Sequence, residues 1–159
     1  MDSGYEIYLQ RAQNELNLSL MIMRISNDKE LQVSTFGMKE DTYYSAAISH
    51  AYYCVFYAAK AYLLLKKIKT DAPEEHKKTF EEFSKLVEKG IVDVELLRIY
   101  QKILIKADTL LHIFKLEKGK RGKFTYKRIP QANREPAKES IDNAQFFVRH
   151  IFELTEKKR

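Results

Sequence analysis

The stretch that decides the fold runs from Ala46 to Leu65 and reads AAISHAYYCVFYAAKAYLLL. It is apolar almost all the way around a helix, whereas a helix at a protein surface carries a single apolar stripe. Lys60 within the stretch argues against a membrane span, because a lysine in hydrocarbon is costly. We therefore predict a buried central helix that other helices enclose.

Apolar residues at steps of three and four predict helices on both sides of this stretch. The five expected helices cover about 5–24, 41 or 42 to 67, 70 or 71 to 90, 93–114, and 133 onward. Asp41 or Thr42, Thr70 or Asp71, Asp93 and Asn133 are the expected N-terminal caps, and Gly90 is the expected end of the third helix. Residues 33–37 are expected to form a connecting loop. Because the connections are short and no strand pattern is credible, the sequence predicts an all-α, up-and-down bundle of about five helices.

Length and composition favour one ordered domain across residues 1–159. Hydrophobic residues make up 45% and charged residues 31% of the chain, a balance that excludes extensive disorder. The one cysteine, Cys54, has no partner for an internal disulfide, and residues 2–14 are too polar for a signal peptide. We therefore expect a cytoplasmic protein without a membrane anchor. No ligand spacing of the zinc type and no phosphate-binding glycine motif is present, so the sequence predicts no metal site and no cofactor.

The positive charge of the chain is concentrated in one segment. Residues 118–128 read KGKRGKFTYKR, which places six of the 28 basic residues together without any of the 22 acidic ones. The remaining basic residues only balance the acidic residues, so the net charge of +6 is local. This concentration predicts a binding site within a basic loop at 117–132, between the last two helices.

The residue types of the basic loop are those that bind phosphate and stack on bases. Glycines at 119 and 122 let a phosphate approach the backbone, and interleaved aromatic rings can stack on nucleobases. An acidic protein partner and a plain solvated loop are the alternatives. The candidate binding residues are Lys118, Lys120, Arg121, Lys123, Phe124, Tyr126, Lys127 and Arg128.

Two helices carry a family resemblance. The order Ala-Ile-Ser-x-Ala-Tyr-Tyr-x-x-Phe-x-Ala-Ala in residues 47–59 is similar to the signature helix of HEPN-domain proteins, which are small helical bundles of prokaryotes. The last helix, with Ala137, Ser140, Ile141, Ala144, Phe147 and Val148, resembles the closing helix of the same group. The resemblance implies a bundle of four to five helices that forms a homodimer. It also implies either pairing with a small nucleotidyltransferase in toxin–antitoxin-like modules or metal-independent endoribonuclease activity.

The ribonuclease branch of that family uses an Arg-x4-6-His motif, which this chain lacks, because no arginine is followed at that spacing by histidine. The nearest substitutes are Arg121 followed by Tyr126, and Lys106 followed by His112. An arginine would hold the scissile phosphate, but a tyrosine is a weak base near neutral pH and a lysine lacks the bidentate fork. The candidate catalytic residues are therefore Arg121, Tyr126 and His112. Lys106-Ala107-Asp108-Thr109 also departs from the Arg-x-x-Ala-Asp-Tyr pattern of many relatives.

Three functional hypotheses follow. The first is a module of a toxin–antitoxin-type pair that binds RNA, nucleotide phosphate or a nucleotidyltransferase partner through the basic loop, which the missing histidine spacing favours. The second is an endoribonuclease with a composite site at the dimer interface, and the third is a structural or regulatory dimer without nucleic-acid contact. Among the other histidines, we expect His50 to be a hydrogen-bonded core residue and His76 to be exposed.

Overall fold

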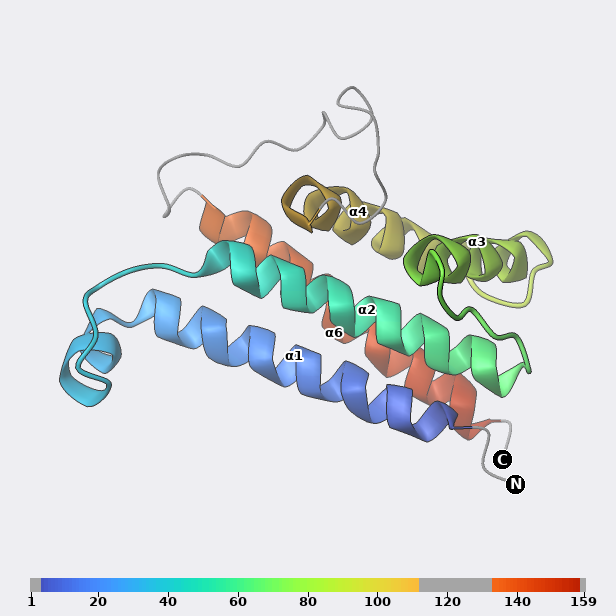
Figure 1. Ribbon diagram of the computed structural model, residues 1–159, viewed down its shortest axis with the longest axis horizontal. Helices are drawn as coiled ribbons and strands as arrows, with labels where there is room; N and C mark the ends of the chain where they lie inside the picture. The colour runs from blue at the N-terminus through green and yellow to red at the C-terminus, as the bar shows by residue number, and fades with distance from the viewer. Residues whose placement is uncertain (1–3, 112–132, 158–159) are drawn as a thin grey trace.

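The computed structural model describes residues 4–111 and 133–157, and all regular structure in these residues is helical (Figure 1). The all-α prediction is confirmed, and each of the five predicted helices corresponds to an observed α-helix. In chain order the elements are α1 (Tyr5–Asn27), the π-helical turn η1 (Leu31–Thr35), α2 (Tyr44–Leu65), α3 (Glu75–Glu88), α4 (Val94–Leu111) and α6 (Arg134–Glu156).

Helix α2 is the centre of the bundle and packs against α1, α3, α4 and α6. Small side chains recur along it at steps of four and three, so they share one face, and all of them are fully buried. They are Ala47, Ala51, Cys54, Ala58 and Ala61. Because these side chains are short, neighbouring backbones approach α2 closely. The prediction of an enclosed central helix is confirmed. Among the described residues, no helix combines the length and apolar character that crossing a membrane requires.

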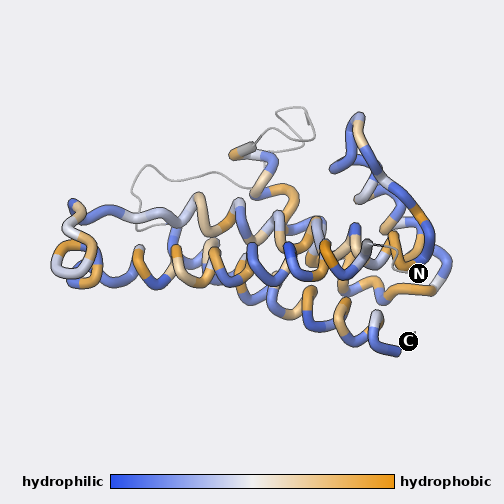
Figure 2. The backbone as a smooth tube through the Cα atoms, turned by 60° about the horizontal axis from the view of Figure 1, so that its bottom comes forward, coloured by the Kyte–Doolittle hydropathy of each residue, from blue (hydrophilic) through white to orange (hydrophobic). Residues whose placement is uncertain are grey.

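Helix α1 runs antiparallel to α2, and α6 lies beside both (Figure 1). The buried Ser19 hydroxyl donates to the carbonyl of Ala47 at 2.8 Å, and the Ser26 hydroxyl accepts from the Tyr43 amide at 2.8 Å. Hydrophobic and hydrophilic residues alternate along the helices (Figure 2), as expected for amphipathic elements around a shared core. The start of α1 and the end of α6 lie at the same end of the bundle (Figure 1).

Three aromatic rings join α3, α4 and α6 in the core. Phe83, Tyr100 and Phe147 are fully buried, and their ring centroids lie 5.5 to 5.9 Å apart. Such tilted and edge-to-face pairs are favourable beyond the burial of their area. This cluster fixes the outer helices to one another on the side of α2 that α1 does not cover.

The connection between α1 and α2 is more ordered than the loop that the sequence predicts. Residues 33–35, part of the expected loop, belong to η1, which the side chain of Gln32 ties to its surroundings. Its amide nitrogen donates to the Ile25 carbonyl at 2.6 Å, and its amide oxygen accepts from the Asp41 backbone at 2.8 Å. Gln32 is 1% exposed, so the connection is pinned by a buried amide.

Two predicted helix caps are wrong, and two helix boundaries are as expected. Tyr43 and Glu74 occupy the N-cap positions of α2 and α3, and neither side chain makes a capping bond. The expected caps of α3 make other contacts, since Asp71 lies 3.8 Å from Lys60 and Thr70 bonds the Thr79 hydroxyl at 2.7 Å. Of the expected caps of α2, the Asp41 carboxylate accepts from the adjacent Thr42 amide at 2.8 Å. The predicted boundaries at Asp93 and Gly90 are confirmed, because the Asp93 carboxylate accepts from the Glu95 amide and Gly90 adopts a φ of 75°. Asn133 holds the N-cap position of α6, again without a side-chain cap bond.

Candidate nucleic-acid interface

The predicted binding and catalytic residues lie outside the described residues. These are His112, Lys118, Lys120, Arg121, Lys123, Phe124, Tyr126, Lys127 and Arg128. The structure does describe the two helices that flank these residues in the chain. These residues follow the end of α4 and precede the start of α6.

Both junctions lie at one end of the bundle. Lys106 on α4 is 3.4 Å from Glu139 on α6, and the two helices run antiparallel (Figure 1). Helix α4 ends five residues after Lys106 and α6 begins five residues before Glu139, so both junctions lie toward the same end of the bundle. The chain therefore leaves and re-enters the bundle at the same end, opposite the start of α1 and the end of α6.

A polar cavity of about 260 Å³ lies where α6 begins. Its lining carries two basic and two acidic side chains, and Lys29 lies 3.6 Å from Glu40. The Tyr44 hydroxyl donates to the Asn27 side chain at 2.6 Å on the same lining. The lining residues are Ser26, Asn27, Lys29, Glu40, Asp41, Thr42, Tyr44 and Arg134. Because its charges balance, the cavity itself offers no excess attraction for an anion.

A pair of polar side chains joins α1 to α2. Glu15 bonds His50 with 2.6 Å between Oε2 and Nδ1, and the two side chains are 23% and 31% exposed. The expected hydrogen bond of His50 is confirmed, but the side chain is partly exposed and so is not a core residue. The Glu15 carboxylate thus orients a His50 ring that water reaches.

One turn along α1, Arg11 packs over two tyrosine rings. Its guanidinium carbon lies 5.4 Å from the ring centre of Tyr8 and 5.7 Å from that of Tyr57. The two rings stack with their centres 6.0 Å apart. Arg11 and Glu15 share one face of α1, so the arginine and the carboxylate–histidine pair form a single polar strip between α1 and α2. Sequence reasoning missed Arg11 and Glu15, because nothing in their local sequence distinguishes them from solvated residues.

The prediction that His76 is exposed is wrong, because α3 carries it into an aromatic site. The Tyr52 hydroxyl bonds His76 Nδ1 at 2.8 Å, and the His76 ring stacks on Phe56 with 4.1 Å between centres. Burial lowers the pKa of His76; the neighbouring Glu75 carboxylate opposes this effect and the Lys60 ammonium adds to it. The neutral imidazole therefore predominates at neutral pH. Burial first, then neighbouring ionisable groups including Tyr100 and Asp108, raise the pKa of Tyr52, so its hydroxyl stays protonated in the hydrogen bond with His76.

Lys60 links this site to α1. It is 3% exposed, and its ammonium lies 2.9 Å from Glu75 and 5.1 Å from the ring centre of Tyr8. The cost of burying the charge is met by the carboxylate and by the aromatic face. The lysine in the central stretch is thus explained by pairing within the bundle.

The lowered pKa of His76 predicts a pH dependence of stability. A histidine whose pKa is lower in the folded state binds its proton more readily when the chain unfolds. The stability is therefore fully present above the ordinary pKa of 6.5 and declines as the pH falls through that value toward the pKa of the folded state. We expect His76→Gln to flatten the fall in the free energy of unfolding between pH 7 and pH 5, measured by urea denaturation. Equal slopes in the parent and His76→Gln would contradict this account.

Within residues 4–111 and 133–157, no three histidine, cysteine or carboxylate side chains come together as metal ligands. The chemical resources of the described part are therefore the Glu15–His50 pair, the Arg11–tyrosine stack and the buried His76–Tyr52 pair.

Comparison with known proteins gives one match. The family model described as HEPN domain matches residues 29–155, which is most of the chain. No curated protein and no solved structure matches the chain.

Proposed function

The chain belongs to the HEPN domain family, and from this premise we propose that it binds RNA or nucleotide phosphate through the basic segment between α4 and α6. We propose further that it acts as a homodimer in a toxin–antitoxin-type pair with a nucleotidyltransferase-type protein. Residues 1–159 serve as one domain in this proposal, because α1, which precedes the matched range, packs along α2.

The observation that carries the proposal is the separation of charge. Six basic residues and no acidic residue stand in 118–128, whereas the polar cavity at the same end of the bundle is balanced in charge. A phosphate backbone is attracted by such a concentration and releases counterions on binding. Phe124 and Tyr126 add rings on which bases stack. Because Lys106 of α4 lies 3.4 Å from Glu139 of α6, close to the end of α4 and the start of α6, both ends of the segment lie toward one end of the bundle.

The first experiment incubates the purified protein with end-labelled single-stranded RNA at low salt without added metal, and reads both retardation and fragments. We expect retardation that weakens steeply with salt. The variant Lys120→Gln/Arg121→Gln/Lys123→Gln should lower the slope of log affinity against log salt by about 2 and the affinity at least about 10-fold, because three phosphate contacts are lost. The matched variant Lys69→Gln/Lys77→Gln/Lys102→Gln removes the same charge from exposed positions and should bind as the parent does.

The same gel distinguishes the other functions. Fragments that vanish in Arg121→Ala would favour an endoribonuclease that uses Arg121 with Tyr126 or His112, because removing a transition-state contact costs orders of magnitude in rate. Equal weakening by both triple variants would contradict the assignment to the basic segment. No retardation and no fragments would exclude both RNA functions and leave a structural or regulatory dimer.

A further inference from the structure

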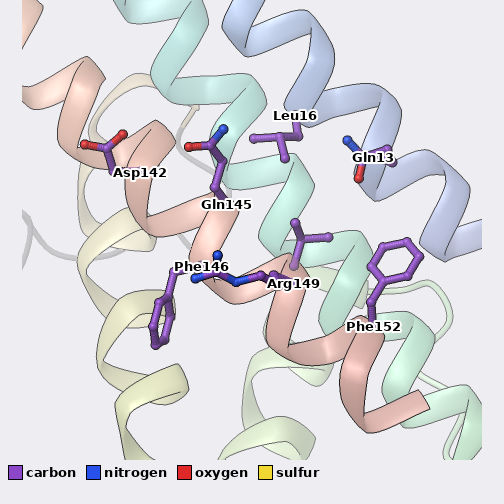
Figure 3. A pocket seen from close by; sticks show the side chains of 8 residues that line it. Gln13, Leu16, Asp142, Gln145, Phe146, Arg149 and Phe152 are labelled. Carbon is purple, nitrogen blue, oxygen red and sulfur yellow. The ribbon is translucent and has the colours of Figure 1, made fainter. Parts of the chain in front are cut away.

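A groove of about 590 Å³ lies between α1 and α6 (Figure 3). Its lining comes from two residues of α1 and six of α6. These are Gln13, Leu16, Asp142, Gln145, Phe146, Val148, Arg149 and Phe152. Leu16 and Val148 are buried, whereas Asp142, Gln145 and Arg149 are exposed to solvent.

The groove contains the side-chain types that contribute most to protein association. Phe146 and Phe152 are half-buried and lie on opposite sides of the exposed face of α6 (Figure 3), and the guanidinium carbon of Arg149 lies 6.0 Å from the ring centre of Phe146. Aromatic residues and arginine dominate the binding energy of protein interfaces. A separate apolar hollow of about 340 Å³ is lined by residues of α1 and by Leu31 and Phe36, and in it Leu20, Met21 and Phe36 are 39%, 56% and 51% exposed.

The charges along the exposed face of α6 are complementary to themselves. Steps of four, three, four and four residues place five exposed side chains on one face of the helix. In order they are Lys138, Asp142, Gln145, Arg149 and Glu153. The signs are positive, negative, neutral, positive and negative, so the same series read backwards has the opposite sign at every charged position.

This pattern selects the occupant of the groove. If a second α6 lies antiparallel across the first, with its midpoint between Gln145 and Phe146, Asp142 faces the second Arg149 and Lys138 faces the second Glu153. Two-fold symmetry repeats each of these pairs, as an isologous interface requires. A parallel arrangement in register would instead place each charge against itself. A phosphate ligand would meet the Asp142 carboxylate next to Arg149, which disfavours it.

We propose that a second copy of this chain docks on the α1–α6 groove, with the two α6 helices antiparallel about an axis at Gln145 and Phe146. The aromatic rings of the groove then leave water, and the four charge pairs set orientation and register. This inference rests on the proposed homodimer, and it does not depend on nucleic-acid binding.

The test measures molar mass by light scattering and sedimentation against the 18.8 kDa of one chain. The parent should have twice that mass. Asp142→Arg places arginine against arginine in both symmetric contacts, and Arg149→Asp places aspartate against aspartate. Each variant alone should dissociate roughly 10- to 100-fold more readily than the parent, because like charges that face each other across an interface are strongly unfavourable.

Mixing the two variants is the decisive arm. In a mixed dimer the arginine introduced at position 142 of one chain would face the aspartate introduced at position 149 of the other, and the two unaltered residues would face each other as in the parent. The mixture should therefore form one-to-one dimers with an affinity close to that of the parent, and Asp142→Arg/Arg149→Asp should dimerise with itself. Arg98→Asp on the exposed face of α4 is the matched control and should leave the parent's mass unchanged.

Circular dichroism confirms that each variant is folded, as expected for exposed positions. If the parent is a dimer and both single variants remain dimers of the same stability, or if the mixture stays monomeric, the proposed interface is wrong but the homodimer stands. A monomeric parent would overturn both the interface and the homodimer. None of these results affects the RNA experiment, because its variants change only the basic segment.

Discussion

Replacing Phe147 with alanine is expected to lower the free energy of unfolding by about 3–5 kcal/mol, the range for removing a fully buried phenylalanine. Phe147 is 0% exposed, and its ring contacts those of Phe83 and Tyr100 from two other helices. The truncation would leave a cavity where three helices meet. Because those helices are held by the rest of the bundle, they can close the cavity only in part.

Urea denaturation at fixed protein concentration measures this effect, since dimerisation would make stability depend on concentration. Phe36→Ala is the matched control, because it removes the same atoms from a side chain that is 51% exposed. Its effect should be well below half of that of Phe147→Ala. Similar losses in the two variants would show that the aromatic cluster does not hold the outer helices in place.

The second large effect is expected at Gln32, where alanine should cost about 1–3 kcal/mol of unfolding free energy. The side chain is 1% exposed and makes hydrogen bonds to the backbone at Ile25 and Asp41. Its loss removes the two hydrogen bonds that tie η1 to the end of α1 and to the residues before α2. The Asp41 amide is then left without its hydrogen-bond acceptor in the protein. We expect faster amide hydrogen exchange in residues 31–43 before the whole protein unfolds.

Gln10→Ala makes the same chemical change at an exposed position of α1 and should change the stability by less than about 0.5 kcal/mol. If exchange in residues 31–43 is the same in both variants, the buried amide does not determine the order of this connection.

The helices of this protein could be predicted because their signals are local. The apolar run from Ala46 to Leu65 permits only an enclosed helix, and the spacing of apolar residues sets the others. The caps of α2 and α3 could not be predicted in the same way. Asp71 has the right side chain for a cap, but Lys60 lies 3.8 Å away and attracts it, and that contact depends on how α3 crosses α2.

The polar strip between α1 and α2 shows the same limit. Glu15 and His50 are 35 residues apart in the chain, and their contact depends on the antiparallel register of α1 against α2. That register depends on the connection through Gln32, whose η1 turn the sequence did not reveal. His76 was misplaced for a related reason, because its local sequence is charged while its aromatic neighbours all come from α2. The basic segment remains a prediction, since its residues lie outside the described part of the chain.

The burial of Cys54 has a consequence for chemical labelling. The thiol is 0% exposed at the centre of α2, and burial raises its pKa, so it is held as the unreactive neutral form. It is also the one cysteine of the chain. A cysteine introduced at a surface position is therefore the single site that a maleimide or a spin label reaches in the folded protein. Attachment at Glu156 and at Arg134 would place probes at opposite ends of α6, about 33 Å apart along the helix axis. Fluorophores at these positions would report separately on the end of the bundle where α1 begins and on the end where α4 stops and α6 starts.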